Sequence, residues 1–185
     1  MKQKLQEQAS DRELLDAVSR GSEEAFVMLY RRHQGAVYRF ALHMSGRRET
    51  AEEVVQEVFA GLLESGSRYD PERGSLEAYL IGSARNQVRV NLRYAARASG
   101  DELPIAMDVP DLEREQDLAK LREAVLSLPV NYREAVVLCD MEELNYETAA
   151  ERLGCPVGTV RSRLHRARAI LLAKMRRQPM AVCQK

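Results

Sequence analysis

The sequence contains no tryptophan, few aromatic residues and only three cysteines. Cys139, Cys155 and Cys183 are odd in number and form no C-x-x-C pair, so neither a disulfide framework nor a zinc knuckle is indicated. No apolar run approaches the roughly 18 residues that indicate a membrane span. The N-terminal residues also lack the apolar core of a secretory signal. We therefore expect a cytoplasmic protein with reduced thiols and no direct membrane insertion.

The sequence also lacks the side-chain sets that catalysis and metal binding require. His33, His43 and His165 are scattered, and there is neither a glycine-rich phosphate loop nor a metal-ligand spacing. The carboxylates lie on stretches with amphipathic helical periodicity, which is typical of surface charge. We expect a protein that is not an enzyme and that needs no cofactor and no metal.

What the sequence does have is segregated charge, although its formal net charge is zero. Residues 1–98 hold 15 basic and 14 acidic side chains, a net of +1. Residues 99–117 hold seven acidic residues and one arginine, a net of −6, and residues 118–185 hold 12 basic and seven acidic residues, a net of +5. The overall balance therefore hides a basic C-terminal part, which is the first indication of function.

The periodicity of apolar residues predicts an all-α protein, because they recur at three- and four-residue spacing almost throughout. The exception is 99–117, which carries two prolines, a glycine and dense negative charge. We interpret it as a flexible acidic linker between two small helical domains, 1–98 and 118–177, with a tail at 178–185. The predicted helices span residues 11–18, 22–45, 49–64, 75–97, 118–127, 130–141, 146–153 and 156–175.

The most specific motif predicts a helix-turn-helix in the C-terminal domain. Ala150, Gly154 and Val160 occupy its small, turn and apolar positions. Apolar residues every three or four positions after the turn predict a buried face, which leaves a basic face for DNA. The residues predicted to contact DNA are Arg161, Ser162, Arg163, His165, Arg166 and Arg168. An ordinary helical hairpin with a solvated basic surface is the alternative.

Two charged stripes of opposite sign mark the N-terminal domain. The basic stripe recurs every four residues and comprises Arg85, Arg89, Arg93 and Arg97. Such a stripe is self-repulsive on an isolated helix, so it favours an anionic partner such as DNA phosphates. The acidic stripe has the same spacing and comprises Glu49, Glu53 and Glu57. It indicates docking to a basic protein surface, with solvated surface as the alternative for both stripes.

Three strings of this sequence resemble a known family. Residues 22–64, SEEAFVMLYRRHQGAVYRFALHMSGRRETAEEVVQEVFAGLLE, and residues 75–93, SLEAYLIGSARNQVRVNLR, are similar to region two of bacterial sigma factors. The helix-turn-helix part, 121–169, resembles region four. Regions one and three are missing, as in the extracytoplasmic-function (ECF) group. The resemblance implies a transcription initiation factor that binds core RNA polymerase, directs it to promoter DNA, helps to open the minus-ten DNA and is restrained by an anti-sigma factor.

The same resemblance implies roles for individual residues. Glu53, Gln56 and Glu57 would face the β′ clamp of polymerase, while region four would read the minus-thirty-five element and bind the β flap with a face around 132–138. The implied minus-ten contacts are Tyr69, Asp70, Ser75, Tyr79, Arg85, Asn86, Arg89 and Arg93. The sequence departs from the family at Tyr79, where tryptophan is usual, and at Leu76, where phenylalanine is common.

A stand-alone helix-turn-helix regulator remains the alternative function. Its C-terminal half could look much the same as the one seen here. Such a regulator would carry a sensor or receiver pattern in its N-terminal domain, whereas this sequence carries opposed acidic and basic helices there. The N-terminal domain therefore favours the sigma-factor interpretation.

Overall fold

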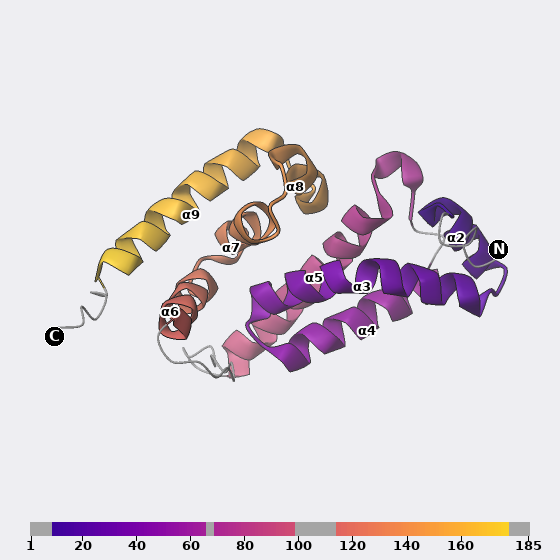
Figure 1. Ribbon diagram of the computed structural model, residues 1–185, viewed down its shortest axis with the longest axis horizontal. Coiled ribbons are helices and arrows are strands. Elements are labelled where there is room, and N and C mark those ends of the chain that lie inside the picture. The colour runs from indigo at the N-terminus through magenta and orange to yellow at the C-terminus, as the bar shows by residue number, and fades with distance from the viewer. Residues whose placement is uncertain (1–8, 66–68, 99–113, 178–185) are drawn as a thin grey trace.

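The computed structural model describes residues 9–65, 69–98 and 114–177, and every regular element within these ranges is helical (Figure 1). The N-terminal elements are α2 (Asp11–Ser19), α3 (Glu23–Ser45), α4 (Arg48–Ser65), the 3-10 turn η2 (Pro71–Arg73) and α5 (Leu76–Ala98). The C-terminal elements are α6 (Arg114–Leu126), α7 (Val130–Val136), the π-helical turn η3 (Val137–Met141), α8 (Tyr146–Leu153) and α9 (Val157–Arg177). The prediction of an all-α fold is confirmed for these residues.

Side-chain caps explain where several helices begin. Ser10 and Glu13 form a capping box at the start of α2, in which each side chain accepts a hydrogen bond from the backbone N–H of the other residue. Ser22 and Asn145 accept from backbone N–H groups in the first turns of α3 and α8, at 3.3 and 2.8 Å. Each cap satisfies a donor that has no partner inside its helix.

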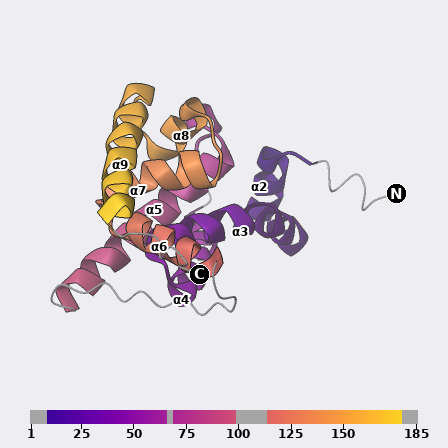
Figure 2. The same ribbon diagram turned by 60° about the vertical axis from the view of Figure 1, so that its left-hand side comes forward.

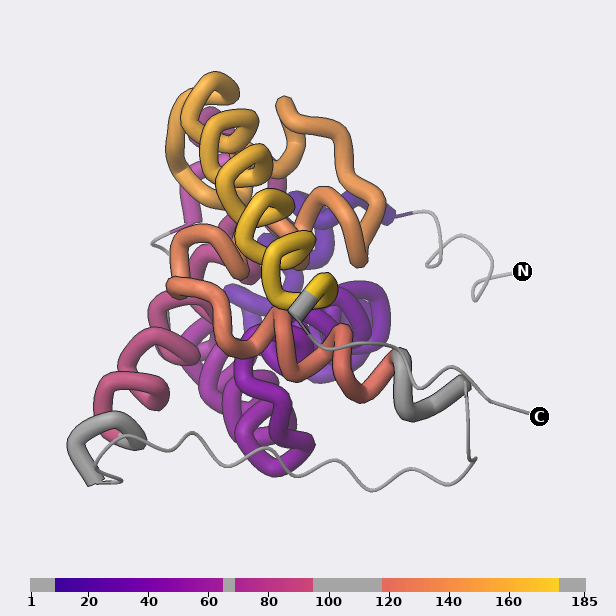
Figure 3. Tube along the Cα trace, turned by 90° about the vertical axis from the view of Figure 1, so that its left-hand side faces the viewer, coloured from indigo at the N-terminus to yellow at the C-terminus, as the bar shows by residue number. Residues whose placement is uncertain are grey.

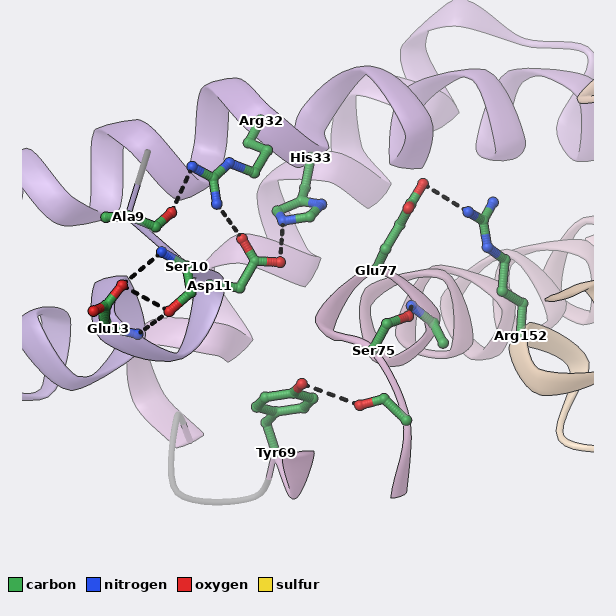
Figure 4. Close-up of polar contacts among 12 residues, drawn as sticks. Ala9, Ser10, Asp11, Glu13, Arg32, His33, Tyr69, Ser75, Glu77 and Arg152 are labelled. Atoms are coloured by element: carbon green, nitrogen blue, oxygen red, sulfur yellow. Dashed lines mark hydrogen bonds and ion pairs between the residues drawn. The ribbon is translucent and has the colours of Figure 1, made fainter. Parts of the chain in front are cut away.

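The helix α3 is central to the N-terminal bundle and packs against α2, α4 and α5. Its buried face includes Leu29, Val37 and Phe40, all of which are fully inaccessible to solvent. Asp11 ties α2 to α3, because it accepts a hydrogen bond from Arg32 at 2.5 Å and lies 2.9 Å from Nε2 of His33 (Figure 4). The histidine that the sequence left without a role therefore has a structural one.

The C-terminal helices α8 and α9 form the predicted helix-turn-helix. Gly154 ends α8 in the left-handed backbone conformation, with φ of 59° and ψ of 42°. A residue with a Cβ adopts this conformation only at a cost in steric energy. Ala150 is buried under the crossing helix, and Val160, Leu164 and Ala167 form the buried face of α9. The predicted inner face is confirmed, so the basic residues of α9 lie on its outer side.

The C-terminal helices pack directly on the N-terminal bundle (Figures 2 and 3). Helix α8 lies against α5, while α6, α7 and η3 contact α3. Val137, Leu153 and Val160 belong to the same buried apolar cluster as residues of α2 to α5. At the end of α3, a Cβ added to Gly46 would meet the Leu126 side chain at 2.5 Å. The spacing analysis did not predict this shared core.

The described ranges and the start of α6 bear on the predicted linker and tail. Residues 99–113 of the predicted linker and residues 178–185 of the predicted tail lie outside the described residues. Helix α6 begins at Arg114, four residues before the predicted start. The segment between the two helical parts is therefore shorter than the acidic composition suggested.

Candidate nucleic-acid and protein interfaces

The outer face of α9 presents five of the six predicted upstream contacts to solvent: Arg161, Ser162, His165, Arg166 and Arg168. The guanidinium carbon of Arg161 lies 5.5 Å from the centroid of the Tyr146 ring. This cation–π contact holds the Arg161 side chain against the first helix of the helix-turn-helix and limits its rotamers. The face is basic, unobstructed and partly pre-oriented, as a surface that enters a DNA groove requires.

Two of the predicted upstream contacts, Arg163 and Arg168, make polar contacts with other elements or turns of the protein. Arg163 is half-buried, and its Nη1 lies 4.0 Å from Sγ of Cys155. Arg168 donates two hydrogen bonds to Asp140, at 3.2 and 2.5 Å. Ser162 Oγ donates to the carbonyl of Thr159 within its own helix at 3.0 Å. Of the six residues, Arg161, His165 and Arg166 are therefore exposed without a side-chain hydrogen bond to the described part of the protein.

A cavity of about 380 Å³ gathers most of the residues predicted to contact minus-ten DNA. The predicted contacts that line it are Tyr69, Asp70, Ser75, Tyr79, Arg85 and Asn86. Arg89 lies one turn further along α5, and Arg93 is exposed beyond it, whereas the side chain of Arg97 lies outside the described residues. The tertiary structure therefore brings together the loop before α5 and the first half of that helix.

Two tyrosines shape the loop end of this cavity. The rings of Tyr69 and Tyr79 pack edge to face, with centroids 5.6 Å apart and an interplanar angle of 60°. The Tyr69 hydroxyl donates to the carbonyl of Gly74 at 3.1 Å (Figure 4). Burial raises the pKa of the Tyr69 hydroxyl above its ordinary value. The pair provides an apolar surface beside a polar rim.

Asp70 and Ser75 position the loop by capping its two helices. Asp70 accepts from the backbone N–H of Glu72 at 3.0 Å and so begins η2. Ser75 Oγ accepts from the backbone N–H of Ala78 at 3.1 Å and so begins α5. The side-chain oxygens of both residues have local structural roles, which leaves the backbone N–H of Ser75 as the donor that faces outward from the loop.

The far wall of the cavity comes from α8 and was not predicted. It comprises Glu151, Arg152, Leu153 and Gly154. Glu151 Oε1 accepts from the backbone N–H of Ser75 at 2.8 Å. Arg152 lies 2.9 Å from Glu77 of α5 in an ion pair (Figure 4). The helix-turn-helix therefore covers the proposed minus-ten surface in this structure.

Two arginines of the basic stripe on α5, Arg85 and Arg89, bind a single buried acid, Glu134 of α7. Its side chain is fully inaccessible to solvent, whereas those of Arg85 and Arg89 are 20% and 25% exposed. Oε1 of Glu134 accepts from Nε of both arginines at 2.7 Å, and Oε2 accepts from Nη2 of Arg89 at 3.0 Å. Arg85 also donates to the carbonyl of Leu153 at 3.1 Å. A buried carboxylate is stable here because two guanidinium groups surround it.

Glu134 had a signal in the sequence that the motif analysis missed. It lies four residues after Val130 and four before Leu138, so helical spacing places it on the buried face. An acid at such a position requires a basic partner. In the predicted flap-binding face around 132–138, residues 133–138 are buried in this structure and Tyr132 is partly exposed. Binding of the flap by this face stays a prediction.

The acidic face of α4 is exposed as predicted. Glu53, Gln56 and Glu57 are all accessible to solvent. Beside them, α3 and α4 form a hollow of about 490 Å³ whose wall includes Tyr30, Tyr38 and Gln56. An acidic ridge next to an aromatic hollow suits a protein partner with a basic surface better than it suits DNA.

Among the described residues, no group of three or more His, Cys, Asp or Glu side chains is arranged to hold a metal ion. In the same ranges no helix has the length and apolarity needed to cross a membrane. Cys139 and Cys155 are half-buried free thiols, and burial raises the pKa of Cys139. Cys183 lies outside the described residues.

Comparison with known proteins adds independent findings. Residues 29–98 match the family described as Sigma-70 region 2, and residues 118–171 match Sigma-70, region 4. The ECF RNA polymerase sigma-E factor of Haemophilus influenzae is 30% identical, over 95% of this chain and 100% of that protein. The ECF RNA polymerase sigma factor SigE of Mycolicibacterium smegmatis is 40% identical over 76% of this chain, which spans 57% of that protein's length.

Solved structures are similar over both helical parts. CnrH, in complex with the cytosolic domain of CnrY, matches with a TM-score of 0.69 and 26% identity, over 91% of this chain and 99% of CnrH. The sigma factor RpoE of Bartonella quintana, in complex with the anti-sigma factor NepR, matches with a TM-score of 0.62 and 26% identity, over 79% of this chain and 93% of RpoE.

Proposed function

The chain belongs to the ECF RNA polymerase sigma factors, which direct RNA polymerase to promoters, and we propose that residues 1–98 read the minus-ten element while residues 118–177 read the minus-thirty-five element. The observation that carries this division is the convergence of six predicted minus-ten contacts on one cavity. The predicted upstream contacts lie instead on the outer face of α9.

The cavity before α5 has the chemistry needed to hold an unpaired base. A base that leaves the helical stack needs an aromatic or apolar surface and polar groups for its edge. Tyr69 and Tyr79 supply the rings, while Asn86 and the backbone N–H of Ser75 supply polar contacts. Arg85, Arg89 and Arg93 follow along α5 and would bind the adjacent phosphates.

The outer face of α9 has the chemistry needed to read a major groove. Arg161 can bond the edge of a guanine, and its contact with Tyr146 reduces the rotamer freedom that binding would remove. Arg166 and Arg176 are exposed and would bind phosphates. Specificity for the upstream element would therefore depend on few residues of one helix.

Protein partners would bind the two remaining kinds of surface. The acidic face with Glu53, Gln56 and Glu57 would dock on the β′ clamp of core polymerase, and the C-terminal helices would bind the β flap. The NepR complex of RpoE supports an anti-sigma factor as a further partner of this chain, because the similarity spans both helical parts. Because core polymerase and promoter DNA are in the cytoplasm, the protein would act there. The proposed binding to polymerase, DNA and an anti-sigma factor requires neither catalysis nor a cofactor.

Transcription in vitro tests the proposal. Purified core polymerase should initiate from a subset of a promoter library only when this protein is added. A requirement for a second sigma factor would favour the stand-alone regulator instead. Variants at Glu53 and Glu57 should lose transcription from every promoter, whereas Arg161→Ala should lose it from some promoters more than others. That contrast separates polymerase docking from DNA reading.

A further inference from the structure

Two carboxylates of the C-terminal helices occupy donors that the proposed minus-ten interface would offer to DNA. Glu134 binds Arg85 and Arg89 on α5. Glu151 binds the backbone N–H of Ser75 at the rim of the cavity. Both acids come from the region that reads the upstream element, and both reach donors on the region that reads the minus-ten element.

The contacts of Glu134 are those that a DNA phosphate would make. A phosphodiester and a carboxylate each carry one negative charge on two oxygens, and a guanidinium binds either through parallel N–H donors. The Nε atoms of Arg85 and Arg89 both point to Oε1 of Glu134 at 2.7 Å, and the carboxylate is fully buried between them. Neither Nε can bind a phosphate at the same time, so closure and DNA binding exclude one another.

Glu151 covers the cavity in the same way. A Cβ added to Gly74 would lie only 2.7 Å from Glu151 Oε1, so the carboxylate is seated directly against the loop backbone. A base entering the cavity would have to displace it from the N–H of Ser75. Other polar contacts span the same boundary, including Arg133 to the carbonyl of Met44 at 2.6 Å.

We infer that the free protein closes on itself, with Glu134 and Glu151 standing in for the phosphate and base acceptors of minus-ten DNA. This inference rests on the proposed function, because it takes Arg85, Arg89 and the Ser75 loop as DNA contacts. Only molecules whose regions have separated can bind minus-ten DNA. The measured affinity is therefore the intrinsic affinity multiplied by the open fraction. Any partner that holds the regions apart raises that affinity.

The test compares the full-length protein with Glu134→Gln/Glu151→Gln in fluorescence anisotropy with a labelled single-stranded minus-ten oligonucleotide. The control is Glu143→Gln/Glu147→Gln, which removes the same charge from two exposed acids of the same region. We expect the first variant to bind about tenfold tighter or more and the control to change less than about twofold. Small-angle X-ray scattering should show a larger radius of gyration for the first variant only.

Binding of an upstream-element duplex reports whether the C-terminal region is folded in each variant. Equal affinity of the wild type and the first variant for the oligonucleotide, with upstream binding intact, would overturn the inference. No binding of either DNA by any variant would refute the proposed function instead. If Glu134→Gln disturbs folding, Glu151→Gln alone decides, because Glu151 is exposed. It should gain about threefold, and unchanged binding would again overturn the inference.

Discussion

Replacing Arg161 with alanine should weaken binding to the upstream element by about 1 to 3 kcal/mol at one or two base pairs. Arg161 is exposed on α9, and its guanidinium carbon lies 5.5 Å from the centroid of the Tyr146 ring. Its donors are therefore available to a base edge. The expected loss corresponds to a factor between about 5 and 150 in affinity.

Two neighbouring substitutions should have smaller effects, for reasons that the structure supplies. Tyr146→Leu keeps an apolar side chain against the core clusters that Tyr146 packs on but removes the cation–π contact that orients Arg161. That contact is worth about 0.5 to 1 kcal/mol at an exposed site, or a factor of about 2 to 5. Arg168→Ala should change affinity less than about twofold, because Asp140 holds that guanidinium with two hydrogen bonds that DNA would have to break.

The assay is fluorescence anisotropy with duplexes that carry single base-pair changes, repeated over a salt series. Arg161→Ala should bind the matched and the changed duplex almost equally at the base pair that it reads. Arg176→Ala should weaken every duplex alike and reduce the salt dependence. Equal losses on all duplexes for Arg161→Ala would assign that residue to phosphate. A loss for Arg168→Ala as large as that for Arg161→Ala would refute the role given to Asp140.

Three further perturbations test other parts of the molecule. Glu53→Lys/Glu57→Lys should weaken pull-down of core polymerase without changing upstream-element binding, and undiminished pull-down would contradict the docking assignment. Arg133→Met should lower the free energy of unfolding, measured in urea, by about 2 to 4 kcal/mol, because three main-chain carbonyls lose their buried donor. A change below about 0.5 kcal/mol would be inconsistent with this role. Burial lowers the pKa of His43 below its ordinary 6.5, so the folded state binds fewer protons than the unfolded state and stability falls as the pH drops below that value. His43→Gln should reduce the difference in melting temperature between about pH 7.5 and about pH 5.5, and an unchanged difference would exclude this histidine as its source.

Local chemistry explains why the sequence predicts the helices so closely. Spacing of apolar residues depends on contacts within one or two turns, and the caps at Ser10, Ser22 and Asn145 act within three residues. The helix-turn-helix follows from the same range, because Gly154 is the residue after α8 that adopts a left-handed backbone. The charged residues of α4 and α9 recur at helical spacing opposite the apolar ones, and for that reason the acidic face of α4 and the basic face of α9 are exposed.

The assignments of Arg85 and Arg89 show where local patterns stop being sufficient. Their four-residue spacing indicates that they share a face and need an anion. It does not indicate which anion binds in the free protein. Glu134 is 49 and 45 residues further along the chain, and Glu151 is 76 residues from Ser75. Only the packing of α7 and α8 on the N-terminal bundle brings these groups within hydrogen-bond distance.

The sequence by itself therefore determined the helical class, the two regions, the helix-turn-helix and the residues whose chemistry suits DNA or a basic protein surface. The tertiary structure decided which of those residues are available. It placed a buried carboxylate between two arginines of the proposed minus-ten surface and an acid of α8 over its cavity. The physical reason is that periodicity reports contacts between near neighbours, whereas the pairing of a buried charge depends on which distant helices share a core.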